Sequence, residues 1–166
     1  MALEYNELIV KYPEFIYHGY DLEKSGDGIR ITYRFETVGL TEFHPCWVFP
    51  KDGIDVSDPV FEEFVFSLGM VELVSYWKAA CPPTVRVECG YLSDEQIAWW
   101  KKLYYHGLGE FFYTNGIDTD MQRFMTIETA KAEKKRAITN GKKLSGCMIP
   151  VGGGKDSIVS LPALSG

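Results

Sequence analysis

The segment from Pro59 to Ala80, PVFEEFVFSLGMVELVSYWKAA, is apolar on nearly every side of the helix that it predicts. Asp58 is expected to cap this helix, because an aspartate carboxylate at the N-cap accepts hydrogen bonds from backbone N–H groups of the first turn. Proline at position 59 fits the first helical position. The letters CPP that follow Ala80 end the helix. A helix that is hydrophobic all round is stable only in the interior of a protein. We therefore expect residues 59–80 to be buried.

A β-hairpin is predicted before this helix. The stretch IRITYRFETV, residues 29–38, alternates apolar and polar side chains and follows the turn sequence KSGDG. A second strand is predicted over EFHPCWVFP, residues 42–50, with the turn at VGLT. Pro45 cannot donate a backbone hydrogen bond, so the second strand is expected at a sheet edge or with a bulge. Residues 3–20 show no clean period and receive no assignment.

Two aromatic or charged helices and a short strand are predicted after residue 80. TVRVECG, residues 84–90, reads as a strand. Ser93 begins a capping-box pattern before one aromatic helix over residues 94–113, and TIETAKAEKKRAITN, residues 126–140, predicts a third helix with Gly141 just past its end. These elements indicate an α+β domain over residues 1–140, with an antiparallel hairpin packed on aromatic helices.

Charge and cysteine spacing exclude several classes of function. The 166 residues carry a net charge of −6, and a nucleic-acid-binding surface is usually basic. No apolar run in these residues is long enough to span a membrane, and we expect no signal peptide ahead of the domain. Cys46, Cys81, Cys89 and Cys147 lack the short spacing of a metal site. We expect a cytoplasmic protein with free thiols and no partner among nucleic acids or membranes.

A glycine-rich turn lies near the end of the sequence, in CMIPVGGGKDSIVSL, residues 147–161. It follows an apolar strand and precedes a predicted helix, which is the arrangement that points backbone N–H groups at an anion. A Walker loop would need glycine where Ile149 stands, and the dinucleotide fingerprint would need glycine at Ser157. The alternative is an ordinary strand-to-helix turn. We interpret Gly152, Gly153, Gly154, Lys155, Asp156 and Ser157 as a phosphate-binding loop.

Other polar side chains are weaker candidates for a functional site. His18, His44 and His106 are too scattered for a metal site, so no metal ligand is predicted. His18, Glu42 and His44 are kept as substrate-binding candidates, because polar and aromatic blocks of this sort often line clefts. The aromatic run of residues 99–116 is interpreted as core rather than as a surface that stacks nucleobases. The basic run from 131 to 143 is interpreted as a solvated helix face.

The letters GGKDS resemble the pyrophosphate loop of the ATP pyrophosphatase superfamily, usually SGGxDS. Gly153, Gly154, Asp156 and Ser157 match this pattern, and Gly152 replaces its first serine. The resemblance implies that the loop holds the phosphates of ATP while a substrate group attacks the α-phosphate. Residues 141–166 would then be the first strand and loop of a truncated α/β nucleotide-binding domain.

The wider chain is similar to the N-terminal part of the UDP-N-acetylmuramoyl-L-alanyl-L-glutamate epimerase family of bacterial cell-wall synthesis, whose members are longer. The resemblance implies inversion of the terminal L-glutamate of the UDP-linked muramoyl dipeptide through an acyl-adenylate, with ATP and Mg²⁺ consumed and AMP and pyrophosphate released. It leaves the catalytic residues unknown. The blocks that carry it are FIYHGYDLEKSGDGIRITYRFE, GLTEFHPCWVFP, GMVELVSYWKAACPPTVRV, WWKKLYYHGLGEFFYTNGI and PVGGGKDSIVSL.

Two alternatives stay open at this point. Another adenylating enzyme with the same loop, such as an amide ligase, would act on a different acceptor. A substrate-recognition domain would bind without turnover. We also expect the 166 residues to be inactive alone and to form a homodimer through the unpaired strand Cys147 to Val151.

Overall fold

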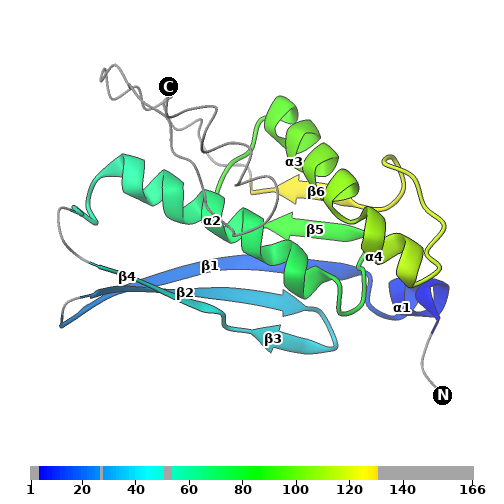
Figure 1. The fold of residues 1–166 in the computed structure, drawn as a ribbon, viewed down its shortest axis with the longest axis horizontal. Coiled ribbons are helices and arrows are strands. Elements are labelled where there is room, and N and C mark those ends of the chain that lie inside the picture. Colours follow the sequence, from blue (N-terminus) through cyan, green and yellow to red (C-terminus); the bar gives the residue numbers. More distant parts are fainter. Residues whose placement is uncertain (1–3, 27, 51–53, 131–166) are drawn as a thin grey trace, which may run out of the picture.

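The computed structural model describes residues 4–26, 28–50 and 54–130. It is an α+β fold, as the sequence predicts, with one sheet and helices packed on one side of it (Figure 1). In chain order the elements are α1 (Tyr5–Lys11), β1 (Glu14–Ser25), β2 (Gly28–Thr37), β3 (Thr41–Phe43), β4 (Cys46–Pro50), α2 (Pro59–Trp77), β5 (Thr84–Val87), α3 (Asp94–Gly107), α4 (Gly109–Thr114) and β6 (Thr126–Thr129).

The sheet is mixed. Its strand order is β3-β2-β1-β5-β6, and β4 pairs with the other half of β2. The pairs of β2 with β1, β3 and β4 are antiparallel, whereas β5 runs parallel to both β1 and β6. Strand β1 therefore joins an antiparallel half of the sheet to a parallel half.

The predicted hairpin is confirmed, with one interruption. After a turn at residues 38–40 the chain pairs with β2 first as β3 and then as β4, with His44 and Pro45 between the two. Proline has no N–H to give to the ladder, but the Pro45 carbonyl still accepts a hydrogen bond from the Tyr33 N–H at 2.9 Å. The strand lies at the sheet edge, as Pro45 predicted.

The sequence failed to predict β1, and the predicted helix over residues 126–140 is wrong at its start. Residues 126–129 form β6, because the β-branched sequence TIET pairs in parallel with β5 and buries Ile127 at 5% exposure. The rest of that predicted helix lies outside the described residues.

The single aromatic helix predicted over residues 94–113 is two helices, separated at Leu108 between two glycines. The Ser93 capping box is confirmed, since its hydroxyl accepts from the Gln96 N–H.

Helix α2 begins as predicted, with the Asp58 carboxylate accepting from the Val60 N–H at 2.8 Å. It covers the sheet with fully buried side chains that include Met70 and Leu73. The prediction that this helix is buried all round is wrong. Phe64, whose ring packs against Phe49 of β4, is 45% exposed, and Val71 is 53% exposed.

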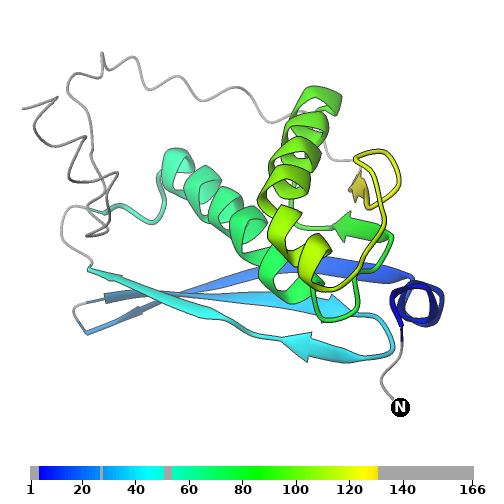
Figure 2. The same cartoon turned by 45° about the vertical axis from the view of Figure 1, so that its right-hand side comes forward.

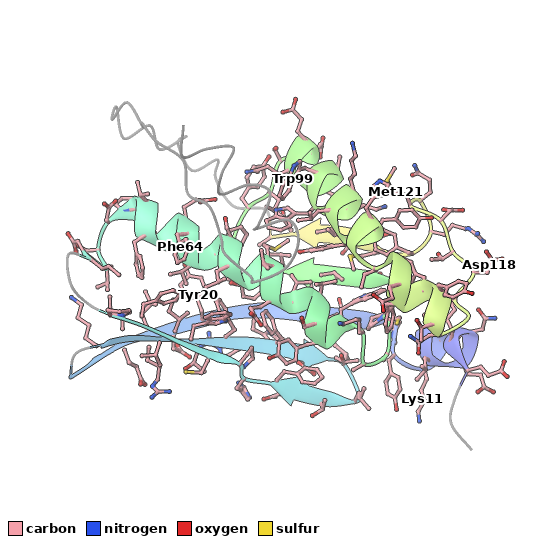
Figure 3. All side chains as sticks on the ribbon, viewed as in Figure 1. Lys11, Tyr20, Phe64, Trp99, Asp118 and Met121 are labelled. Carbon is pink, nitrogen blue, oxygen red and sulfur yellow. The ribbon has the colours of Figure 1, made fainter. Side chains whose placement is uncertain are left out.

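The contact between α2 and the sheet is close at Gly69. A Cβ atom on Gly69 would lie 2.1 Å from Tyr17 Oη and 2.8 Å from Tyr33 Cε1, so no larger residue fits without a shift. The Tyr33 hydroxyl donates to the Val65 carbonyl of the same helix at 2.9 Å. Tyr20 also lies between α2 and the sheet (Figure 3). Aromatic side chains of β1 and β2 thus fill the space beneath α2.

The described residues include three of the four cysteines and all of the helices that the structure assigns. Cys46, Cys81 and Cys89 are free, while Cys147 lies outside the described residues. Between residues 4 and 130, every helix falls short of the length and hydropathy required to cross a bilayer.

Candidate functional site

The face of the sheet opposite the helices is open. In both cartoon views α2, α3 and α4 lie on one side of the strands, and no described helix covers the other side (Figure 2). Strand alternation sends the apolar side chains of β2 toward the helices and Arg30, Thr32, Arg34 and Glu36 toward the open face. The open face is consequently rich in charged groups.

A β-bulge in β1 sets the position of His18. The register with β2 shifts between Tyr17 and Gly19, so His18 is an extra residue without a direct partner. Bulges re-aim side chains and are common beside functional sites. Gly19 has a φ of +156°, and a Cβ there would lie 3.0 Å from an Arg34 guanidinium nitrogen. Glycine therefore allows the chain to bend past Arg34 at the bulge.

The His18 imidazole is held between two carboxylates from different strands. Its Nε2 lies 2.9 Å from Glu36 Oε2 on β2, and its Nδ1 lies 2.8 Å from Glu88 Oε2 just after β5. Ionised carboxylates only accept hydrogen bonds, so both ring nitrogens donate when His18 is an imidazolium. Burial lowers the pKa of His18, but the hydrogen bonds to Glu36 and Glu88 and the charges of these carboxylates raise it by more, so the pKa lies above its usual value. His18 is suited to hold and release a proton near neutral pH.

Glu88 extends this arrangement to a second cation. Arg86 Nε lies 3.5 Å from Glu88 Oε1 and 3.3 Å from Glu14 Oε1. We call Glu14, His18, Glu36, Arg86 and Glu88 the His18 cluster. Its three carboxylates exceed its two cations even when His18 is charged. The surplus negative charge stabilises the proton on His18 and disfavours direct binding of an anion.

The other two weak candidates lie on the same face. Glu42 of β3 pairs directly with Glu36 of β2, and His44 Nε2 is 3.3 Å from Glu42 Oε2. The structure thus places Glu42 one strand away from the His18 cluster, with His44 beside it at the sheet edge. These contacts are consistent with a shared polar site, but the substrate-binding roles of all three residues stay predictions.

Metal-ligating side chains do not cluster among the described residues, and burial perturbs two of the described thiols. No group of three or more metal-ligating side chains is present among residues 4–26, 28–50 and 54–130. Burial raises the pKa of the Cys81 thiol to about 12. It is also the largest of the effects that raise the pKa of the Cys89 thiol to about 12. Both thiols stay protonated at neutral pH and are poor nucleophiles.

A family model described as the MurL N-terminal domain matches residues 7–166. The chain belongs to the MurL N-terminal domain family. The match includes the whole His18 cluster and the loop from Gly152 to Ser157. This loop, and the strand Cys147 to Val151 through which a dimer is predicted, lie outside the described residues.

A curated relative gives the MurL N-terminal domain family a chemical context. The UDP-N-acetyl-alpha-D-muramoyl-L-alanyl-L-glutamate epimerase of Xanthomonas oryzae pv. oryzae (strain MAFF 311018) is 35% identical over 97 residues. The matched stretch is 58% of this chain and 21% of the relative, so the chain spans only a small part of the relative's length. No solved structure gives a significant match.

Sequence reasoning missed four members of the His18 cluster, namely Glu14, Glu36, Arg86 and Glu88. The alternation in IRITYRFET places Glu36 on the polar face of β2, and TVRVE places Arg86 on the corresponding face of β5. The sequence pattern therefore contained the signals for Glu36 and Arg86. It did not contain the β1–β5 pairing, which brings residues 18 and 88 together.

Proposed function

We propose that this chain is the N-terminal part of an ATP-dependent epimerase that inverts the terminal L-glutamate of UDP-N-acetylmuramoyl-L-alanyl-L-glutamate, a step in peptidoglycan precursor synthesis. The observation that carries the proposal is the family match over residues 7–166, together with the activity in the relative's name. In this proposal residues 1–140 form one domain and residues 141–166 begin a nucleotide-binding domain.

Activation of the glutamate carboxylate explains the need for ATP. A proton next to a free carboxylate is hard to remove because a dianion would form, whereas an acyl-adenylate carries no charge there. Backbone amides from Gly152 to Ser157 and the Lys155 ammonium are donors that suit phosphate oxygens. Mg²⁺ would be bound with the ATP phosphates near this loop. ATP supplies the activating group, and AMP and pyrophosphate are the expected products.

The described domain contributes a group that can handle a proton. Epimerisation requires one group to remove the α-proton and another to return a proton on the opposite face. The His18 imidazolium, held by Glu36 and Glu88, is a proton donor whose side chain is 34% exposed. We assign the proton-returning role to His18: one imidazolium proton leaves its hydrogen bond to Glu36 or Glu88 and passes to the carbanion at the α-carbon, and the ring is left neutral between the two carboxylates. The proton-removing base is not assigned.

The direct test uses the full-length protein with the UDP-linked dipeptide, ATP and Mg²⁺. Glutamate stereochemistry is resolved after hydrolysis, and the nucleotide products are separated. We expect D-glutamate with AMP and pyrophosphate. Ser157→Ala and Asp156→Ala should each lower turnover by more than about tenfold, because each removes a contact that stabilises charge in the transition state. Ser75→Ala, on the exposed side of α2, is the matched serine control and should keep normal turnover.

Each contrary result has a defined meaning. ADP as product would contradict adenylation. AMP formation with L-glutamate joined to another group would favour an amide ligase. Tight binding of the dipeptide without any turnover would favour a recognition domain. His18→Gln with unchanged turnover and an unchanged pH profile would remove His18 from the mechanism.

A further inference from the structure

A row of side chains crosses the open face of the sheet from β3 to β6. Residues directly opposite one another on paired strands share a face of the sheet. The strand registers align five of them in order across the sheet, namely Glu42, Glu36, Ile16, Arg86 and Glu128. Glu14 and Glu88 contact Arg86 beside this row. The row is therefore acidic at both ends and contains a single arginine.

The other described cations of this face leave the row negatively charged. Arg34 forms an ion pair with Asp21, and Arg30 lies opposite Glu23 of β1. Arg86 and the imidazoles of His18 and His44 face five carboxylates, those of Glu14, Glu36, Glu42, Glu88 and Glu128. Parallel strands are usually covered on both faces of their sheet, and no described helix covers this face of β1, β5 and β6 (Figure 2).

A basic segment of the chain begins beside this row. Residues 131–143, KAEKKRAITNGKK, contain six lysine or arginine residues and one glutamate, a net charge of +5 in a chain whose total is −6, and they lie outside the described residues. The preceding residue, Ala130, donates its N–H to the Val87 carbonyl at 2.9 Å. The segment therefore begins one strand away from Glu88. The sequence alone favours a solvated face for this basic run, but the described part of the chain offers it an acidic partner.

We propose that residues 131–143 bind the open face of the sheet in their own chain, with their lysine and arginine side chains paired to the carboxylates of the row. The segment is long enough for this contact. Four strand spacings separate β6 from β3, which is about 19 Å. Thirteen residues span about 20 Å as a helix and more when extended, so either conformation reaches Glu36 and Glu42.

The covalent connection at Ala130 makes weak ion pairs effective. One exposed ion pair contributes little and is screened by salt. A tethered segment has a high effective concentration at the row, so several pairs form without the entropy cost of bringing in a separate molecule. The bound segment offsets the surplus negative charge of the His18 cluster, which otherwise disfavours an anion there. Binding of the segment does not depend on the proposed activity.

The test is carbodiimide coupling of lysine amines to carboxylates in the 166-residue chain at low salt, followed by mass spectrometry of the linked peptides. The decisive links join lysines of residues 131–143 to Glu36 and Glu42, because these carboxylates lie on the far half of the sheet. We expect them to form at least about fivefold more often than links to Glu95 and Glu110, which are exposed on α3 and α4. Mixing isotope-labelled and unlabelled chains shows whether both peptides come from one molecule.

Charge reversal within the segment provides the variant. Replacing Lys134, Lys135 and Arg136 together with glutamate should lower the yield of the links to Glu36 and Glu42 about fivefold or more. It should also raise the pKa of His18 measured by NMR, because bound cations disfavour the proton on the imidazole. The charge-matched control replaces three exposed lysines elsewhere with glutamate and should keep the links and move the His18 pKa far less; these are Lys11, Lys78 and Lys102.

Three results would overturn the proposal. They are links spread evenly over both sides of the sheet, links formed only between different molecules, and an unchanged link yield and His18 pKa after charge reversal of the segment. Because turnover is not among the readouts, these results would leave the proposed activity standing. An inactive full-length protein would likewise leave the expected links unchanged.

Discussion

Replacing Gly69 with alanine should destabilise the fold, although alanine is the better helix former. In a solvated helix this substitution stabilises by up to about 1 kcal/mol. At position 69 the new Cβ would lie 2.1 Å from Tyr17 Oη and 2.5 Å from Tyr17 Cζ, well inside van der Waals contact. Tyr17 and Tyr33 are both fully buried, so neither ring can move into solvent.

The expected loss combines three effects. Overpacking of a well-filled core costs about 1–3 kcal/mol, and we expect the upper end because the clash is with ring atoms. A shift of α2 also strains the hydrogen bond from Tyr33 to the Val65 carbonyl, worth about 1 kcal/mol. The gain in helix propensity, up to about 1 kcal/mol, offsets an amount similar to the cost of the strained hydrogen bond. We therefore expect Gly69→Ala to lower the free energy of unfolding by about 3 kcal/mol.

The assay is urea unfolding of the 166-residue chain followed by circular dichroism. Gly107→Ala is the matched control, because no atom lies within 4 Å of its added Cβ and α3 ends there. It should be neutral or stabilise by about 0.5 kcal/mol. Tyr17→Phe removes the nearest clashing atom and should itself be tolerated, since the polar neighbour of Tyr17 Oη is the Cys89 thiol, a weak hydrogen-bonding group. In that background the cost of Gly69→Ala should fall by about 1 kcal/mol.

Equal stability of the Gly69→Ala and Gly107→Ala variants would refute this reasoning. It would mean that α2 does not approach the sheet as closely as the tyrosine contacts require. A full cost in the Tyr17→Phe background would place the clash elsewhere than at the hydroxyl.

The remaining predictions concern two polar or strained positions. The pKa of His18 is raised in the folded state, so its stabilising contribution is complete below the unfolded value of about 6.5 and is lost as pH rises through the raised folded pKa. The stability lost in His18→Gln should thus shrink from pH 6 to pH 9, and a pH-independent loss would contradict this. Glu88→Gln should lower the His18 pKa measured by NMR, and an unchanged pKa would remove Glu88 as a cause of the shift. At Cys81, whose φ of +52° is in the left-handed region, glycine should be more stable than alanine by about 1 kcal/mol, the reverse of the order in a helix, and the opposite ranking in thermal unfolding would show that φ is not constrained there.

Local signals in the sequence predicted the elements whose ends carry specific chemistry. Asp58-Pro59 and the Ser93 capping box fixed two helix starts, because caps act within one turn of the chain. β1 escaped notice because its outward-facing Ile16 is buried at 4% exposure and the bulge at His18 shifts the alternation. β6 was mistaken for a helix because its strand character comes from pairing with β5, a contact that no local pattern contains. For the same reason the sequence predicted only His18 of the His18 cluster, because strand pairing brings its other members to this place.

The position of β1 between an antiparallel and a parallel neighbour also orders how the chain assembles. Its pairing with β2 closes at Ser25 and Gly28, whereas its pairing with β5 joins Glu14 to Thr84. Short-range pairing forms faster than long-range pairing, so the hairpin is expected to fold first. During synthesis one edge of β1 then has no partner until β5 has been made, and an unpaired edge is prone to intermolecular association. Nascent chains that end between Pro50 and Pro83 should therefore aggregate more than chains that extend past Val87.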